Sequence, residues 1–378
     1  MGETSRTRAD LEVAEPLLAH LRERLGRSAL GYARVPTLLE GGSDALVARF
    51  ELSHAGPGWG GPLVFRRLRA RTPPERARLE AAVQNGLVEQ GFPAPAVLLA
   101  EADASRLGGA FLVMRVVPGA PLLLGWSLRL RTAKVGIGGW LSALRRGPAL
   151  ARELPTLLAS LEQRIHAVDT APIARRLEEL GVPASRISLE GRLGRLVRRL
   201  ESRWLAHLEP GLAWILEHFP GGQGRIVLNH GDLAPTNVLV EAGEVTGVID
   251  WSKALLAERE CGVGFTRAAI ATLPTPAPPG LRGALARMRE QAADEYLRAY
   301  ARAHPVSAER VRYYEALRTL SMLAASEKRR HRSVRRLHVL DLAGARSLLA
   351  RHFARLTGVE LLLDAGEPAS QGACPDAA

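Results

Sequence analysis

Residues 226–251 read IVLNHGDLAPTNVLVEAGEVTGVIDW, and the fold can be inferred outward from this stretch. Ile226–Leu228 is a short apolar run, and a polar loop that begins at His230 follows it. Asn237–Val240 is apolar and β-branched, and a turn that contains glycine separates it from a second such run, Val245–Ile249. This order predicts a strand, a loop and then a β-hairpin.

The hairpin predicts which polar side chains lie together. A turn of four residues pairs Val240 with Val245 and Asn237 with Val248. Because side chains alternate along a strand, Asp250 would then point to the same face as Asn237. We therefore expect one end of the hairpin to present an amide oxygen beside a carboxylate.

Oxygen ligands of this kind suit Mg²⁺, which usually keeps several coordinated waters and is also coordinated by substrate phosphates. In phosphoryl transfer, one Asp accepts the proton of the attacking hydroxyl, and an Asn and a second Asp hold the metal. Asp232, Asn237 and Asp250 fit these roles in that order. The alternative is a polar loop in which Asp232 and Asn237 only cap turns. Asp250 fits this alternative less well, because a carboxylate at a strand end beside Trp251 is costly unless it is paired.

The order HGD, four residues, Asn and then Ile-Asp-Trp resembles the Brenner-type motif of the aminoglycoside phosphotransferase and choline kinase superfamily. The resemblance implies an α+β, two-lobed protein-kinase-like fold, with a small β-rich N-lobe and a larger helical C-lobe. It also implies transfer of the γ-phosphate of ATP, with Mg²⁺, to a hydroxyl of a small molecule. We expect a nucleotide-binding lobe over residues 1–115, a catalytic and acceptor-binding lobe over residues 116–364, and a disordered tail over residues 365–378.

Two segments before the motif resemble parts of that family's nucleotide site. Gly41, Gly42 and Ser43 lie in a turn between two apolar runs and match the loop that covers the nucleotide. Glycines let backbone amides approach phosphates closely, although most such pairs are ordinary turns. A later apolar run ends at Met114, and the following segment resembles the hinge between lobes, so the backbone of Met114 and Val116 would hold adenine.

The strand expected at Pro62–Arg66 carries arginine where kinases place a lysine that contacts the α and β phosphates. The chain has no lysine before Lys134, so Arg66 is the matching residue, and it would bind phosphate as a bidentate fork. The family branch that resembles the kinase domains attached to acyl-CoA dehydrogenases also carries arginine here. Glu80, on a helix expected over Pro74–Gln90, aligns with the glutamate that pairs with this cation. The alternative leaves both side chains in solvent.

The segment after Trp251 departs from the family pattern. Relatives usually read Asp-Trp-Glu, then Gly-Asp-Pro and a further Asp-Leu, whereas residues 252–262 read SKALLAERECG. Glu258 would replace the first of these later acidic residues, and Gly262 stands in the place of the second. These changes and the missing strand lysine favour an alternative function, a nucleotide-binding pseudokinase that acts through a protein partner.

Helical periodicity predicts further helices over Asp10–Leu25, Leu281–Tyr300, Ser307–Ser326 and Arg335–Leu356. Another apolar stripe marks a core helix that ends near His166, which we expect to be a packed structural histidine and no ligand.

The composition suits a globular protein: 378 residues, of which 47% are hydrophobic and 24% charged, are enough for two lobes. No apolar run reaches the roughly 18 residues of a membrane span, and the N-terminus lacks a signal pattern. Cys261 and Cys374 cannot form a disulfide framework, which suits a reducing compartment. We therefore expect a cytoplasmic protein with no membrane partner.

The net charge of +12 arises mainly in residues 281–360, where 17 Arg and Lys stand against 8 Asp and Glu, a net charge of +9. No nucleic-acid-binding signature accompanies this charge, so a nucleic-acid partner is not expected. Such charge is often a solvated helix face. In relatives, however, the C-terminal helices help line the acceptor site, and a positive wall favours a neutral or anionic hydroxyl acceptor over a polycation.

Overall fold

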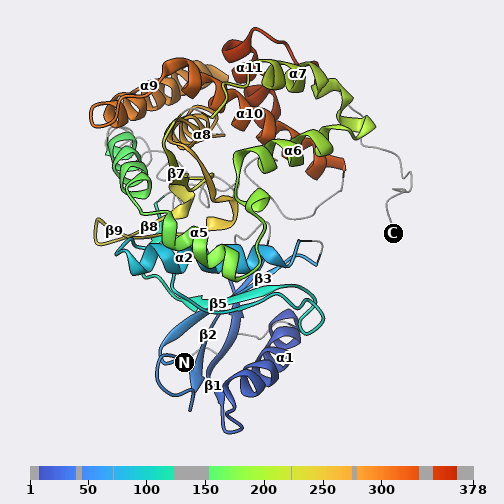
Figure 1. The fold of residues 1–378 in the computed structure, drawn as a ribbon, viewed down its shortest axis with the longest axis vertical. Coiled ribbons are helices and arrows are strands. Elements are labelled where there is room, and N and C mark those ends of the chain that lie inside the picture. The colour runs from blue at the N-terminus through green and yellow to red at the C-terminus, as the bar shows by residue number, and fades with distance from the viewer. Residues whose placement is uncertain are drawn as a thin grey trace. The chain divides into compact units, whose positions relative to one another are not determined.

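The computed structural model describes residues 8–39, 45–70, 72–122, 153–222, 224–274, 279–331 and 344–363 (Figure 1). The chain divides into two compact units. Unit 1 comprises Met1–Val135, Arg164–Ser188 and Val227–Leu256, and unit 2 comprises Gly136–Gln163, Leu189–Ile226 and Ala257–Ala378. The motif stretch therefore groups with the N-terminal sheet. The lobe boundary expected at residue 115 rests on a different criterion and stays a prediction.

Unit 1 is built on a five-stranded antiparallel sheet with the strand order β1-β2-β3-β5-β4. The strands are β1 (Gly31–Leu38), β2 (Ala45–Ser53), β3 (Pro62–Leu68), β4 (Val97–Glu101) and β5 (Phe111–Arg115). The helices of unit 1 include α1 (Arg8–Leu25), α2 (Glu75–Glu89) and α5 (Ala171–Glu179). The sequence did not predict β4, because its residues, VLLAE, lack polar and apolar alternation.

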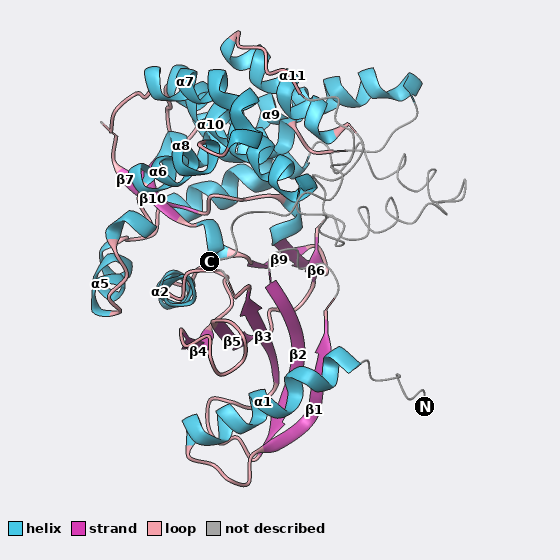
Figure 2. Cartoon of the chain, turned by 90° about the vertical axis from the view of Figure 1, so that its right-hand side faces the viewer, coloured by secondary structure: helices cyan, strands magenta, loops and turns pink. Residues whose placement is uncertain are grey.

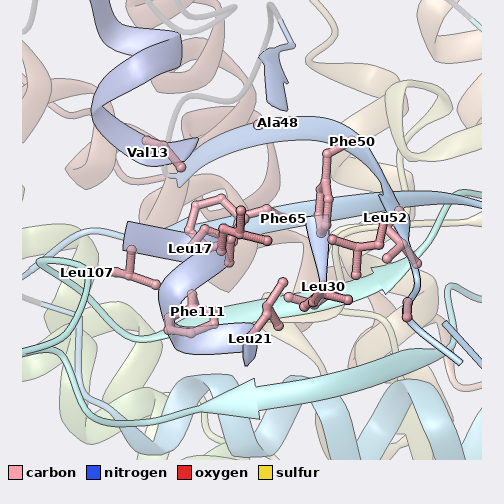
Figure 3. Packing of buried hydrophobic residues seen from close by; sticks show 14 residues of the cluster. Val13, Leu17, Leu21, Leu30, Ala48, Phe50, Leu52, Phe65, Leu107 and Phe111 are labelled. Atoms are coloured by element: carbon pink, nitrogen blue, oxygen red, sulfur yellow. The ribbon is translucent and has the colours of Figure 1, made fainter. Parts of the chain in front are cut away.

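Each face of this sheet has its own core. On one face, α1 packs Leu17 and Leu21 against Phe50, Phe65 and Phe111, which come from three neighbouring strands (Figure 3). All five side chains are at most 1% exposed. Burying a side chain of this size stabilises the fold by roughly 1.5–3 kcal/mol, so this cluster is a major part of the stability of unit 1.

The opposite face of the sheet is covered by α2 (Figure 2). Its small residues Ala77 and Ala81 pack against Leu112 and Met114 of β5. Small side chains let the helix approach the sheet closely, and this places Glu80, on the same buried side of α2, inside the protein. The other flank of α2 packs against α5.

The motif stretch folds as a series of short elements. They are β7 (Ile226–Asn229), η3 (Pro235–Asn237), β8 (Val238–Glu241), β9 (Glu244–Val248), η4 (Trp251–Lys253) and β10 (Leu255–Glu258). β8 and β9 form a three-stranded antiparallel sheet with β6 (Ala120–Pro121), and β7 and β10 form a two-stranded sheet. The predicted strand, loop and hairpin are therefore present.

The register of the hairpin differs from the prediction. Val240 pairs with Val245 as expected, but Val248 pairs with Val238, and the predicted pairing with Asn237 is wrong. The cause is an irregularity of the ladder next to Val240, where β9 contributes one residue more than β8. A slip of one residue reverses the face on which every later side chain lies.

Unit 2 is helical in the part of the chain that the structure describes. Its named α-helices are α6 (Leu189–Leu200), α7 (Glu209–Glu217), α8 (Arg259–Ala271), α9 (Arg282–Ala301), α10 (Ala308–His331) and α11 (Ala345–Thr357). Gly264 lets α8 approach α10, because a Cβ there would lie 2.7 Å from the carbonyl oxygen of Val311. No described helix is long and apolar enough to cross a membrane.

The C-terminal helices follow the sequence prediction in part. The helices expected at Leu281–Tyr300 and Ser307–Ser326 are α9 and α10. The helix expected from Arg335 cannot be continuous, because Gly344 has a φ of 84° and α11 begins only after it. Residues 335–343 of this prediction lie outside the described residues.

Candidate functional site

His230 joins the two halves of the motif. Its side chain is buried, and its Nδ1 lies 3.2 Å from the backbone nitrogen of Asp232, whose N–H donates to it. Its Nε2 lies 3.0 Å from the carbonyl oxygen of Ile249. Because Nδ1 is an acceptor, Nε2 must carry the proton that is donated to Ile249. The neutral imidazole therefore fixes the loop of Asp232 to the end of β9.

The backbone of Asn237 is linked to the residue before Asp250, and this link is not the predicted strand pairing. Asn237 is the last residue of η3, and Asp250 follows β9 in the left-handed conformation with φ 64° and ψ 61°, so neither position follows from strand alternation. The backbone N–H of Ile249 donates to the carbonyl oxygen of Asn237 at 2.9 Å. The Asn237 Nδ2 donates to the carbonyl oxygen of Asp232 at 2.9 Å, which leaves its amide oxygen as an acceptor.

Asp250 is paired with Arg66, whose Nη2 donates to Oδ1 at 3.0 Å. Its side chain is 38% exposed, so the carboxylate lies at the surface of the site. Burial of the carboxyl would raise its pKa, but the charges of Arg66 and Lys253 outweigh this effect and hold the pKa of Asp250 below its usual value. The group is therefore ionised at neutral pH, as a metal ligand must be.

Arg66 also donates to Glu80 Oε2, so the predicted pairing of these residues is present. The Arg66 side chain is 14% exposed and the Glu80 side chain is fully buried. Burial raises the pKa of Glu80 to about 6, against the opposing effect of Arg66. One guanidinium thus connects β3, α2 and the end of β9.

The sequence analysis did not predict the contact between Lys253 and Asp232. The Lys253 Nζ donates to Asp232 Oδ2 at 2.6 Å, so the predicted catalytic carboxylate is held in an ion pair. The signal was present in the sequence, because Lys253 is one of only three lysines in the chain and lies two residues after Trp251 of the IDW motif. Its contact with Asp232 depends on the left-handed turn at Asp250, which residue types alone did not indicate.

The short helix η4 is anchored on both sides. Trp251 is fully buried, its Nε1 donates to the carbonyl oxygen of Val248 at 2.9 Å, and its ring lies edge-on to Phe92. Arg76 of α2 donates to the carbonyl oxygen of Ser252. These contacts fix the backbone from which the side chain of Lys253 extends.

His166 has the structural role that was expected. It ends a helix over residues 153–166, is 7% exposed, and its Nε2 lies 3.1 Å from Asn229 Oδ1. The Asn229 Nδ2 donates to the carbonyl oxygen of Val227. His166 thus supports the strand that leads into the motif.

Glu258, in the altered segment after Trp251, lies in the interior of unit 2. Glu258 is 2% exposed and accepts hydrogen bonds from Arg310 Nε at 3.0 Å and from the Tyr314 hydroxyl at 2.6 Å. The contacts of Glu258 in this structure are with Arg310 and Tyr314, and its replacement of the family's later acidic residue stays a prediction. Asn237 and Asp250 remain as the candidate ligands.

The candidate ligands fit Mg²⁺ only if waters and substrate phosphates supply the rest of its coordination. Among the described residues, no group of three or more His, Cys, Asp or Glu side chains could hold a metal. One amide oxygen and one ionised carboxylate suit Mg²⁺, which fills its remaining positions with waters and substrate phosphates. Asn237 and Asp250 would hold it in this way.

The remaining nucleotide-site residues are not tested by the structure. Gly41, Gly42 and Ser43 lie outside the described residues. Met114 lies in β5 between β3 and β4, and the N–H of Val116 donates to the carbonyl oxygen of Pro62 at 3.3 Å. Hydrogen bonds from the backbone of Met114 and Val116 to adenine would compete with these hydrogen bonds of the sheet. The adenine contacts stay a prediction.

A family model described as the phosphotransferase enzyme family matches residues 36–306, which is most of the chain. The chain belongs to the phosphotransferase enzyme family. The match covers all the motif residues discussed above, whereas α1 and α11 lie outside it. No curated protein matches this phosphotransferase.

Solved structures support the fold class of this phosphotransferase. A candidate aminoglycoside phosphotransferase from Ralstonia eutropha JMP134 is 19% identical, covers 91% of this chain and 98% of its own, and gives a TM-score of 0.58. Aminoglycoside phosphotransferase APH(4)-Ia, in a ternary complex with ADP and hygromycin B, is 18% identical, with coverages of 93% and 99% and a TM-score of 0.54. The predicted α+β, protein-kinase-like fold is confirmed.

The raised pKa of Glu80 predicts a pH-dependent stability. Between its ordinary value of 4.5 and about 6, the folded protein binds more protons than the unfolded chain, so stability falls as the pH rises through this window. Glu80→Gln removes this effect, which is on the order of 2 kcal/mol. Thermal unfolding midpoints measured between pH 4.5 and 7.5 should therefore show Glu80→Gln gaining on the wild type by several degrees.

The control for this prediction is Glu89→Gln on the same helix, since the Glu89 side chain is 55% exposed and pairs with Arg176 at the surface. Its midpoint should follow the wild type at every pH. If the unfolding midpoints of Glu80→Gln and the wild type changed in parallel with pH, the raised pKa of Glu80 would be contradicted.

Proposed function

We propose that the protein is an ATP- and Mg²⁺-dependent phosphotransferase that moves the γ-phosphate to a hydroxyl of a small molecule. The observation that carries this proposal is the gathering of one ionised carboxylate, one amide and a second carboxylate, Asp250, Asn237 and Asp232, at the end of one hairpin. Membership of the phosphotransferase family supports it. Similar structures of APH(4)-Ia are complexes with ADP and with AMP-PNP, which favours an adenine nucleotide here.

In the proposed reaction, Asp232 accepts the proton of the acceptor hydroxyl. The hydroxyl oxygen forms a bond to the γ-phosphorus, the bond from this phosphorus to the bridging oxygen breaks, and ADP leaves. Bound Mg²⁺ would neutralise charge on the phosphates. Asn237 and Asp250 would orient it, and Arg66, fixed by Glu80, would contact the phosphates from the sheet.

A second candidate is a pseudokinase that binds nucleotide and acts through a protein partner. The arginine in place of the strand lysine and the altered segment after Trp251 favour it. The two candidates differ in turnover, so a phosphate-transfer screen over diverse hydroxyl compounds, with and without Mg²⁺, distinguishes them. No transfer to any compound, together with tight nucleotide binding, would favour the pseudokinase.

The inferred acceptor is a small molecule, and neither a membrane nor a nucleic acid forms part of the proposal. We further infer a cytoplasmic location from the sequence. The chain has two cysteines, and Cys261 is buried as a free thiol, which suits a reducing compartment.

Asp232→Asn should abolish turnover while nucleotide binding persists. The amide cannot accept the hydroxyl proton, and the removal of general-base catalysis typically costs about 10²–10⁴-fold. Nucleotide affinity should come from other residues and stay near the wild-type value in calorimetry. Asp103→Asn, in an exposed loop after β4, is the matched control and should keep wild-type turnover. Near-native turnover of Asp232→Asn would refute its role.

Asp250→Asn should lose the part of nucleotide affinity that depends on Mg²⁺. Asparagine tolerates the left-handed conformation of this position, so the backbone should keep its turn. We expect ATP affinity in Mg²⁺ to fall by roughly tenfold or more, because a charged ligand of the metal is lost. Affinity in EDTA should change little. Equal Mg·ATP affinity of variant and wild type would count against the metal site.

We also infer that the acceptor is neutral or anionic. Residues 281–360 carry a net charge of +9, and a positive wall repels a polycation. Although APH(4)-Ia forms a complex with hygromycin B, we expect hydroxy acids and sugar-like compounds to be phosphorylated here in preference to kanamycin-like compounds. Ratios of kcat/KM measured for these classes test this, and a preference for the polycations would refute it.

A further inference from the structure

The ion pair of Lys253 with Asp232 is the feature of the site that the proposed function leaves unexplained. The two charged atoms lie 2.6 Å apart, and the side chains of Lys253 and Asp232 are 39% and 18% exposed. A surface ion pair of this kind usually contributes little to stability. Its position on the predicted catalytic carboxylate therefore needs an explanation other than stability.

The position of Lys253 is built by its surroundings. Its backbone belongs to η4, in which the buried Trp251 and the hydrogen bond from Arg76 to Ser252 fix the chain on both sides of the turn. The N–H of Ala254 donates to the carbonyl oxygen of Trp251 at 3.0 Å and closes this turn. These contacts fix the backbone from which the Lys253 side chain reaches Asp232.

The ammonium group is near both functional carboxylates. It contacts Asp232 directly, and its residue ends the short helix η4, for which Asp250 is the N-cap. In phosphoryl transfer, the transferred group lies between the metal and the attacking hydroxyl, with charge spread over its oxygens. Asp250 marks the proposed metal side and Asp232 the hydroxyl side, so Lys253 lies where that charge develops.

The choice of lysine also fits such a role. Only 3 of the 51 Lys and Arg residues are lysines, so a lysine here is unusual for this chain. Arg66 gives Nη1 to Glu80 and Nη2 to Asp250, which holds its guanidinium in place. Lysine carries a compact point charge on a flexible four-carbon stem. Its ammonium group can exchange one oxygen partner for another, whereas the planar guanidinium of arginine binds best in a fixed bidentate geometry.

We propose that Lys253 is a further catalytic residue, whose ammonium group leaves Asp232 and binds the γ-phosphate when ATP enters the site. The inference rests on the proposed function. Release of Lys253 frees Asp232 to accept the hydroxyl proton, and the ammonium group neutralises the phosphoryl oxygens while the new oxygen–phosphorus bond forms and the bond to the ADP oxygen breaks. Lys253 keeps its own protons throughout.

The test compares ADP with AMP-PNP, which has the third phosphate that ADP lacks. Calorimetry in Mg²⁺ is carried out on the full chain as wild type, Lys253→Met, Lys253→Arg and, as a control, Lys328→Met on α10. Lys253→Met should weaken AMP-PNP binding by roughly tenfold or more, because a charge-assisted hydrogen bond is lost, and change ADP affinity by less than about twofold. Lys253→Arg should recover part of the loss, and Lys328→Met should bind both nucleotides like the wild type.

Each other outcome has a definite meaning. If Lys253→Met binds AMP-PNP as tightly as the wild type, the proposal is overturned, and a fall in turnover would then mark Lys253 as a positioning residue for Asp232. Equal weakening of both nucleotides also overturns it, since it would indicate a structural defect. A wild type that binds neither nucleotide overturns the proposed function itself, which is visible before any variant is compared.

Discussion

The motif site depends on the guanidinium of Arg66, which pairs with two carboxylates at once. Arg66 of β3 gives one end to Glu80 of α2 and the other to Asp250, which follows β9. A charge with so little exposure is tolerated only when it is paired, and removal of one partner of such a pair costs about 3–5 kcal/mol. The guanidinium therefore fixes a strand, a helix and a hairpin that are far apart in the sequence in one arrangement.

The backbone after β9 transmits this constraint. Asp250 has a left-handed conformation that is uncommon for a residue with a side chain, and such positions persist only where their surroundings determine them. Here the ion pair with Arg66 lies on one side and the buried Trp251 on the other. The turn between them directs η4 so that Lys253 reaches Asp232. A strained backbone and two ion pairs thus define the functional face.

The sequence predicted what depends on residue type and order. The hairpin and the pair of Arg66 with Glu80 followed from the apolar pattern and from the resemblance. The register of the hairpin was not predicted correctly, because one additional residue in β9 places Val238 opposite Val248. The contact of Lys253 with Asp232 was not predicted either, because it requires the left-handed turn. Strand alternation does not apply to Asn237 and Asp250, since both lie outside the paired strands, and their joint role as metal ligands stays a prediction.

The two cations of the site are held in different ways. The guanidinium of Arg66 is held by two carboxylates, whereas Lys253 extends from a short turn and pairs with Asp232. Mg·ATP brings further negative charge, which a rigid set of ion pairs cannot neutralise without losing a partner. Under the proposed function, the ammonium group of Lys253 would leave Asp232 and follow the charge as it moves from ATP to the acceptor.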